Sequence, residues 1–359
     1  MGDCFTERCE SMPDGELISV TINDGIKKFS ELGRHDNSND DKSKYKKVCT
    51  GDIAYNSMRM WQGASGCSPY EGIVSPAYTV LTPNSGINSK CMAYQFKLPA
   101  TIHTFKINSQ GITSDNWNLK FPALSEIEIY VSPYEQEQAK IAAYFANLDH
   151  LITLHQRKYD KLQVLKKAML EKMFPKNGSS VPEIRFKGFT DAWEQRKLGA
   201  LCVEFKSGDF ISASDIAENE AYPVYGGNGL RGFTNHYNHD GEYALIGRQG
   251  ALCGNVNYAV GKSYFTEHAV AVRANKTNQT RFLYYLFSTM NLGQYSGQSA
   301  QPGLAVGNLV ELENVVPSKP EQEKIASFLS SLDNLITLHQ RELEKLQNIK
   351  KSMLEKMFA

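Results

Sequence analysis

The chain has 359 residues, a length that suggests two or three folded domains. Its composition, 41% hydrophobic and 22% charged, is that of a globular protein and excludes a wholly disordered chain. Lysine and arginine (39) balance aspartate and glutamate (39), so the net charge alone indicates no nucleic-acid partner. No apolar run approaches the about 18 residues of a membrane span, and no signal sequence opens the chain. Seven cysteines without a CxxC pair are typical of a reduced protein, so we expect a cytoplasmic one.

The first 136 residues contain stretches of β-branched and aromatic residues between turn residues, which predict strands. These stretches are 17–22, 51–58, 72–81 and 125–131. A Gly-acid pair, Gly51-Asp52, opens the second stretch. We expect this segment to form a first domain of mixed α/β structure.

Residues 137–174 are free of proline and glycine and rich in good helix formers. The same pattern returns at 321–358: a shift of 184 aligns 38 positions without a gap, and 25 are identical. Each copy predicts one helix of roughly 57 Å at 1.5 Å per residue. The two copies divide the chain into domain-sized segments at 1–136 and 179–319 and helices within 137–178 and 320–359.

An apolar stripe with steps of three and four residues follows each predicted helix. A helix this long needs a partner that buries its apolar stripe. The other copy carries a matching stripe, which predicts an antiparallel, coiled-coil-like pair. The predicted partner-binding residues are Leu148, Ile152, Tyr159, Leu162, Leu332, Ile336, Leu343 and Leu346.

The segment 179–319 repeats the organisation of the first segment only loosely. Strands are predicted at 242–247, 255–260, 268–274 and 312–317, and a helix at 280–290. Gly241-Glu242 opens a strand as Gly51-Asp52 does, and an arginine follows in each segment, Arg59 and Arg248. This order predicts a shared scaffold that carries divergent surfaces.

No motif for catalysis or for a metal is convincing, so no catalytic or metal-binding residue is predicted. Gly227-x-Gly229-x-x-Gly232 matches a dinucleotide-binding spacing, but turn-forming residues follow where that mechanism needs a helix. His236 and His239 lack a third ligand at a fixed spacing. We interpret both as parts of polar loops.

Side chains suited to DNA gather after one strand of each segment. Arginine can make two hydrogen bonds to guanine, asparagine and glutamine can do so to adenine, and lysine suits phosphate. The predicted DNA-binding residues are Lys44, Lys46, Tyr55, Asn56, Arg59, Gln62, Asn228, Arg231, Arg248 and Gln249. For Arg248 an alternative stays open, a structural pairing with Glu242 or Glu267.

The two EQxKIAxxxxxLDxLITLHQR helices that end in MLEKMF resemble the specificity subunit of type I restriction-modification systems. The segment 181–199, the glycine-rich loop 226–232 and Gly247-Arg-Gln-Gly250 add to the resemblance. It implies two target-recognition domains separated by two similar helices, and recognition of a bipartite double-stranded DNA target without catalysis. It also implies two methyltransferase subunits and a restriction subunit as partners. S-adenosylmethionine, ATP and Mg²⁺ are then expected on those partners and no cofactor on this chain. A coiled-coil scaffold or inactive variant that does not recognise DNA is the alternative function.

One departure from this family pattern concerns the first segment. Residues 182–197, the lead segment, precede the second domain, and no counterpart precedes the first. Met1-Gly2 aligns best with Leu198-Gly199. We therefore expect the first domain to lack the lead segment that the second domain has.

Overall fold

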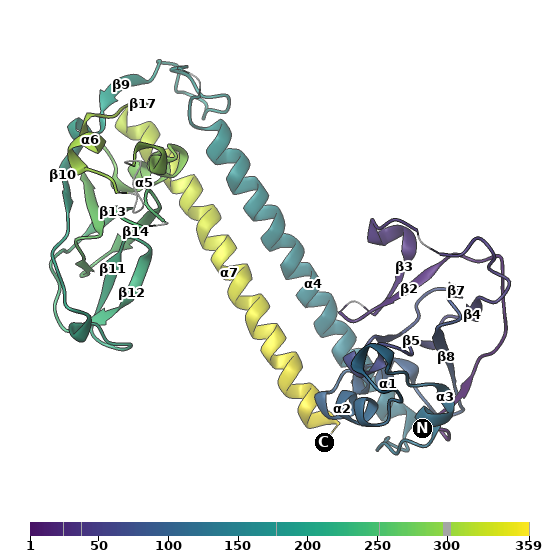
Figure 1. Ribbon diagram of the computed structural model, residues 1–359. Coiled ribbons are helices and arrows are strands. Elements are labelled where there is room, and N and C mark those ends of the chain that lie inside the picture. Colours follow the sequence, from purple (N-terminus) through teal and green to yellow (C-terminus); the bar gives the residue numbers. More distant parts are fainter. Residues whose placement is uncertain (24, 37, 177, 251, 297–302, 359) are drawn as a thin grey trace. The chain divides into compact units, whose positions relative to one another are not determined.

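The computed structural model describes residues 1–23, 25–36, 38–176, 178–250, 252–296 and 303–358. The chain divides into two compact units: unit 1 comprises 1–156 with 341–359, and unit 2 comprises 157–340. Two long helices, α4 (Glu135–Lys172) and α7 (Lys319–Met357), each begin in one unit and end in the other (Figure 1). Both predicted long helices are confirmed.

Unit 1 is built on a four-stranded antiparallel sheet in the order β1-β8-β5-β6. Its strands are β1 (Phe5–Glu7), β5 (Ile53–Asn56), β6 (Ser65–Cys67) and β8 (Tyr78–Pro83). Two antiparallel ribbons join β2 (Ile18–Thr21) to β3 (Gly25–Lys28) and β4 (Lys46–Val48) to β7 (Gly72–Val74). The short helices are α1 (Ser89–Gln95), α2 (Pro99–Ile107) and α3 (Phe121–Ser125). Phe5, Phe96 and Phe105 are fully buried between this sheet and the short helices, where their rings meet edge to face.

Unit 2 contains a matching four-stranded antiparallel sheet in the order β10-β16-β13-β14. Its strands are β10 (Cys202–Ser207), β13 (Glu242–Gly247), β14 (Val256–Val260) and β16 (Ala269–Ala274). A second sheet has the order β12-β11-β15, with β11 (Tyr222–Gly226), β12 (Gly229–Thr234) and β15 (Tyr264–Phe265). Strand β9 (Glu194–Lys197) pairs with β17 (Glu313–Val316), and the helices are α5 (Thr280–Thr289) and α6 (Val306–Glu311).

The two four-stranded sheets share one scaffold. Ile53 faces Leu81 in the first sheet as Ala244 faces Val272 in the second, a constant difference of 191 positions. In unit 1 the residue after the central strand is Ser57, and its carbonyl oxygen accepts from the N–H of Leu119 at 2.9 Å. In unit 2 that residue is Arg248, and its carbonyl oxygen accepts from the N–H of Leu304 at 2.9 Å. The expected shared scaffold is therefore present. The ladder places Ser57, and not Arg59, at the position of Arg248, which corrects the correspondence that the sequence suggested.

Most strand predictions are confirmed, and two are corrected. The stretch 72–81 forms two strands, β7 and β8, instead of one. Residues 125–131 pair with no strand of the described chain, although the sequence predicts a strand there. The equivalent stretch in unit 2 becomes β17 because β9 pairs with it, so a neighbour and not propensity decides the outcome.

Within each unit, half of α4 packs against half of α7. Lys350 Nζ lies 2.5 Å from Asp149 Oδ1 in unit 1, and Lys166 Nζ lies 2.5 Å from Asp333 Oδ1 in unit 2. The repeat shift of 184 converts Asp149 into Asp333 and Lys166 into Lys350. Asp149 therefore contacts the repeat copy of Lys166, and Lys166 contacts the repeat copy of Asp149. This reciprocity is that of an isologous two-fold contact. The predicted antiparallel pairing is confirmed in both units.

Candidate nucleic-acid interface

Two loops of unit 2 meet at the end of β13. A Cβ on Gly247 would collide with the carbonyl oxygen of Gly227, and a Cβ on Gly227 would lie 3.0 Å from the oxygen of His268. Glycine is needed at both positions because backbone approaches backbone there. The contact joins the turn between β11 and β12, which carries Asn228, to the loop that carries Arg248 and Gln249. Arg231 follows that turn in β12, so the four predicted DNA-binding residues of unit 2 lie on or next to two loops in contact.

Arg248 attaches its loop to the end of β10 and to the backbone at Leu304. Its Nε donates to the carbonyl oxygen of Leu304 at 3.2 Å, and its Nη1 donates to Ser207 Oγ at 3.1 Å. The guanidinium is only partly exposed. The alternative of an ion pair between Arg248 and Glu242 or Glu267 is wrong. Glu242 lies 3.8 Å from Arg281, and Glu267 lies 3.2 Å from His268. Arg248 therefore has a structural role, but through a carbonyl and a hydroxyl instead of a carboxylate.

The neighbours of Arg248 face solvent. Arg231, Asn228 and Gln249 are exposed, and the backbone of Gln249 forms a bridge with Gly303. The side chain of Arg231 forms no ion pair with a described residue and passes over Gly226, whose missing Cβ leaves it room. An extended arginine without an internal partner can make two hydrogen bonds to a base edge or a phosphate.

In unit 1 the corresponding loop follows β5. Arg59 is exposed and forms no ion pair with a described residue, while Gln62 is partly buried. Asn56 is partly buried, and its Oδ1 accepts from the backbone N–H of Met58 at 3.0 Å. This loop has the exposed cation that its sequence predicts, whereas its two amide side chains are partly buried.

Tyr55 is a correction to the predicted site. It lies in β5 with no exposed surface, in the core cluster of unit 1. Burial also raises the pKa of its phenol well above the usual value. Alternation along a strand decides this, because Asn56 points toward the surface and Tyr55 toward the core.

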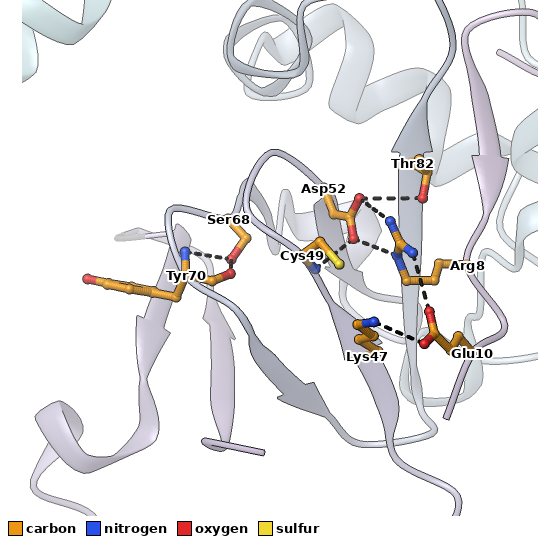
Figure 2. Close-up of polar contacts among 8 residues, drawn as sticks. All are labelled: Arg8, Glu10, Lys47, Cys49, Asp52, Ser68, Tyr70 and Thr82. Carbon is orange, nitrogen blue, oxygen red and sulfur yellow. Dashed lines mark hydrogen bonds and ion pairs between the residues drawn. The ribbon is translucent and has the colours of Figure 1, made fainter. Parts of the chain in front are cut away.

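The two predicted lysines, Lys44 and Lys46, differ in how available they are to phosphate. Lys44 is exposed, but Lys46 Nζ lies 3.0 Å from Glu7 Oε1. Lys47 Nζ likewise lies 3.0 Å from Glu10 Oε1 (Figure 2). A phosphate at Lys46 has to compete with Glu7 for the ammonium.

A buried carboxylate anchors the strand that precedes the unit 1 loop. Asp52, 2% exposed, accepts from Arg8 Nε at 2.8 Å, Arg8 Nη2 at 3.1 Å and the N–H of Cys49 at 2.8 Å (Figure 2). The bond to Asp52 raises the pKa of Arg8 above its already high value. Arg8 also lies 3.6 Å from Glu10, so Lys47 and the start of β5 share one charge network. The Gly-acid motif is thus a structural anchor in unit 1.

Sequence reasoning missed an aromatic cluster beside the Arg59 loop. Trp61 packs edge to face on Trp117 with ring centroids 5.2 Å apart, and its indole N–H donates to Met58 at 3.1 Å. Lys106 Nζ lies 5.6 Å from the centre of the Trp117 ring. Trp61 stands two residues after Arg59, a signal that sequence inspection could have used, but only the fold brings Trp117 beside it.

A second missed feature is a Tyr-Asp-Lys cluster that occurs once in each unit. In unit 1, Tyr94 Oη donates to Asp149 at 2.8 Å, and Lys350 binds the other carboxylate oxygen and lies over the Tyr94 ring. In unit 2, Tyr285, Asp333 and Lys166 make the same contacts, with the tyrosine bond 2.7 Å long. Burial and then the bond to aspartate raise the pKa of both tyrosines.

These clusters attach each domain to its helices. Tyr94 lies on α1 and Tyr285 on α5, whereas the aspartates and lysines come from α4 and α7. Gln138 and Gln322 reinforce the attachment, because their Oε1 atoms accept from the N–H of Asn88 (2.8 Å) and Gln279 (3.0 Å), the first-turn caps of α1 and α5. The orientation of each set of loops on the helix pair is therefore defined by side-chain contacts.

The predicted partner-binding stripe is mostly occupied within the units. Leu148 and Leu332 are buried, and Ile152, Tyr159, Leu162, Ile336, Leu343 and Leu346 are partly buried. Other apolar residues of the helices stay open: Leu151, Leu154, Leu335 and Leu338 are 39–52% exposed. The repeat shift relates Leu151 to Leu335 and Leu154 to Leu338. Two equivalent apolar surfaces thus remain, one in each unit.

Neither the predicted loop histidines nor other residues of the described chain form a cluster suited to a metal ion. His239 is buried and lies 3.2 Å from Glu204, which gives it a structural partner. No helix of the described residues is long and apolar enough to cross a bilayer.

Comparison with known proteins identifies the family. The family described as type I restriction modification DNA specificity domain matches residues 22–164 and 190–348. These matches cover most of the chain, one for each half, and the chain belongs to this family.

Individual relatives agree with this assignment. The chain is 45% identical over 146 residues, 40% of its length, to the EcoprrI type I restriction enzyme specificity subunit of Escherichia coli, but spans only 36% of that protein. It is 22% identical over 350 residues to the MjaVIII specificity subunit of Methanocaldococcus jannaschii, covering 87% of this chain and 81% of the relative. In fold it resembles the crystal structure of a type I restriction-modification system S subunit from M. genitalium, with a TM-score of 0.70, 18% identity and coverage of 100% and 94%.

Proposed function

We propose that this chain is the non-catalytic specificity subunit of a type I restriction-modification complex and recognises a bipartite double-stranded DNA target. The observation that carries the proposal is that both units contain the same four-stranded sheet and differ in the loop that follows its central strand, β5 or β13. Arg59 with Gln62 follows one central strand, and Arg231, Arg248 and Gln249 surround the end of the other. Each loop cluster would recognise one half of the target from the major groove.

The helix pair has the properties of a spacer between the two half-sites. Asp149–Lys350 and Lys166–Asp333 hold both halves of the pair in one register. The distance between half-sites would then follow the helix length, as dimer geometry sets half-site spacing in other DNA-binding proteins.

Partner subunits would supply what this chain lacks. Its 39 cations and 39 anions leave few charges for phosphate neutralisation, so methyltransferase subunits that surround the duplex would add affinity. The two equivalent surfaces at Leu151–Leu154 and Leu335–Leu338 fit two identical partners. These subunits would carry S-adenosylmethionine and flip the target adenine, and a restriction subunit would bring ATP and Mg²⁺.

Methylation mapping tests the proposal. Cells that express the chain with its methyltransferase partner should carry one bipartite methylated motif. Replacing residues 179–319 by the corresponding segment of another specificity subunit should change one half of that motif and preserve the other. A change in both halves would contradict recognition by two separate domains.

A spacer variant tests the role of the helices. Four residues inserted after Arg157 and four after Arg341 add about one turn, roughly 6 Å, to each helix. The gap between the methylated half-sites should lengthen. An unchanged gap in an active protein would contradict the spacer role, and a folded chain without sequence-specific binding beside its partners would favour the scaffold alternative.

A further inference from the structure

Residues 108–118 of unit 1, here called the tip loop, lie beside the loop that carries Arg59. Trp117 of the tip loop packs edge to face on Trp61, with ring centroids 5.2 Å apart. Trp61 stands two residues after Arg59 and belongs to the loop that follows β5. An aromatic contact thus joins a loop that the sequence analysis did not single out to one that it did.

The tip loop occupies a position that both units define in the same way. Leu119, which follows the tip loop, bonds through its N–H to the residue after β5, Ser57. Leu304 bonds in the same way to the residue after β13, Arg248. The tip loop therefore adjoins the end of the central strand, where each unit carries its candidate DNA contacts.

Backbone contacts fix the conformation of the tip loop. Gln110 and Asn118 exchange two backbone hydrogen bonds, of 3.0 and 2.8 Å, across its base. Gly111 has a φ of 145°, and a Cβ at this position would lie 2.6 Å from the carbonyl oxygen of Asn116. Both the φ value and the close approach require glycine. The backbone, and not burial of a side chain, therefore sets the position of the next residue.

That next residue, Ile112, is 99% exposed. Single exposed apolar side chains are common on protein surfaces and need no explanation by themselves. Ile112 differs because it projects from a loop that is fixed by its backbone and attached to the Arg59 loop. Its β-branched side chain is also stiff at χ1, so contact with a ligand would cost little side-chain entropy.

The charge around Ile112 favours an anionic ligand. In residues 56–63 and 104–120 three cations stand against one acidic residue, whereas residues 1–136 as a whole contain 13 cations and 16 anions. The charged residues of the two short stretches are Arg59, Lys106, Lys120 and Asp115. Cations suit phosphates, and an apolar side chain among them suits the methyl group of thymine in the major groove.

We propose that the tip loop is a second DNA-contacting loop of unit 1, in which Ile112 contacts the methyl group of a thymine in the half-site that unit 1 recognises. Ile112 is then a specificity-determining residue outside the Arg59 loop, because the methyl group distinguishes thymine from the other bases. This inference rests on the proposed DNA recognition and adds to it an apolar contact with a named chemical group.

The experiment uses the full chain in complex with its methyltransferase subunits and duplexes of the mapped target. Each thymine of the first half-site is replaced in turn by deoxyuridine, which lacks only the methyl group. A half-site that is methylated at adenine contains an A·T pair, so at least one thymine is present. For the wild type, one replacement should lower the affinity about four-fold, the effect of burying one methyl group at about 0.8 kcal/mol.

Ile112→Ala should abolish this difference, because the shorter side chain no longer reaches the methyl group. The variant should bind the thymine duplex about four-fold more weakly than the wild type does, with an unchanged melting temperature. Ile107→Ala is the matched control, since Ile107 is 67% exposed but lies on α2, outside the tip loop. It should retain the difference between thymine and deoxyuridine.

The same titrations separate this inference from the proposed function. If no replacement affects the wild type, or if Ile112→Ala retains the difference, the inference is wrong, while sequence-specific binding by the wild type still supports the proposed function. Ile112→Ala that weakens association with the methyltransferase subunits in the absence of DNA would show that the tip loop binds protein, and would also overturn the inference. A wild-type complex without sequence-specific binding would contradict both.

Discussion

Unit 1 and unit 2 contain the same four-stranded sheet and the same attachment to the helices, yet they differ in what covers them. Unit 2 has the lead segment, a buried Arg185–Glu321 pair and a buried Trp193. In unit 1, Glu137, the repeat copy of Glu321, is exposed and accepts a hydrogen bond from the hydroxyl of Ser132. The same helix motif therefore serves as a core surface in one unit and as a solvent-facing surface in the other. Identical residues of the repeat therefore contribute differently to the stability of the two units, because their neighbours differ.

The largest expected difference concerns the paired glutamates. Glu321→Gln removes one partner of a buried ion pair and should destabilise unit 2 by about 3 kcal/mol. Glu137→Gln removes an exposed carboxylate and should change the stability of unit 1 by less than about 0.5 kcal/mol. Hydrogen exchange followed separately in β16 and β8 measures both. Equal losses in the two units would contradict the comparison.

The candidate DNA contacts sharpen the comparison next. Arg59→Ala and Arg231→Ala remove exposed arginines, and each should cost about 1–3 kcal/mol on the specific duplex and relax one position, in the first and second half-site respectively. Both variants should keep the wild-type melting temperature. Affinity on matched and mismatched duplexes in the presence of the methyltransferase subunits is the measurement.

Arg248→Ala is the contrasting variant. It should lower the melting temperature as well as the affinity, because Arg248 bonds to Leu304 and Ser207. Weakening that is uniform over all duplexes, with a normal melting temperature, would instead indicate a phosphate contact.

The Tyr-Asp-Lys clusters should respond alike in the two units. Asp149→Asn and Asp333→Asn each weaken a tyrosine bond and a lysine bond on a partly exposed carboxylate, so each should cost about 1 kcal/mol. Tyr94→Phe and Tyr285→Phe are the matched controls for the hydroxyl bond alone. Chemical denaturation with exchange readout checks this, and a loss in only one unit would show that the repeat does not preserve the cluster energetically.

The smallest expected effect concerns pH. As the pH falls, the stability of unit 2 should decrease before that of unit 1. Burial lowers the pKa of His239, against the opposing pull of Glu204. A lowered histidine pKa stabilises the fold above the unfolded value near 6.5, and this contribution is lost as the pH falls through the folded pKa. His239→Gln should therefore flatten the melting temperature of unit 2 between about pH 6.5 and 5. An unchanged pH profile in this variant would exclude His239 as the cause.

Much of the architecture could be predicted from the sequence. The 184-residue shift located both long helices, and β-branched and aromatic residues between turn residues located β5, β13, β14 and β16, because such residues favour strands. The candidate site was predicted less well. Arg59, Arg231 and Gln249 are exposed as expected, but Tyr55 is core, and Arg248 makes internal bonds that no spacing indicated.

What the sequence determined by itself was the plan of two similar domains and two equivalent helices, since a repeat of 25 identities in 38 positions specifies the same local structure twice. The tertiary structure alone decided which residues of that repeat are buried. Residues 125–131 pair with no strand of the described residues whereas β17 has β9 beside it, and Glu137 is exposed whereas Glu321 meets Arg185. Helix propensity is a local property of the chain, but strand pairing, burial and ion pairing require a partner from elsewhere in the chain.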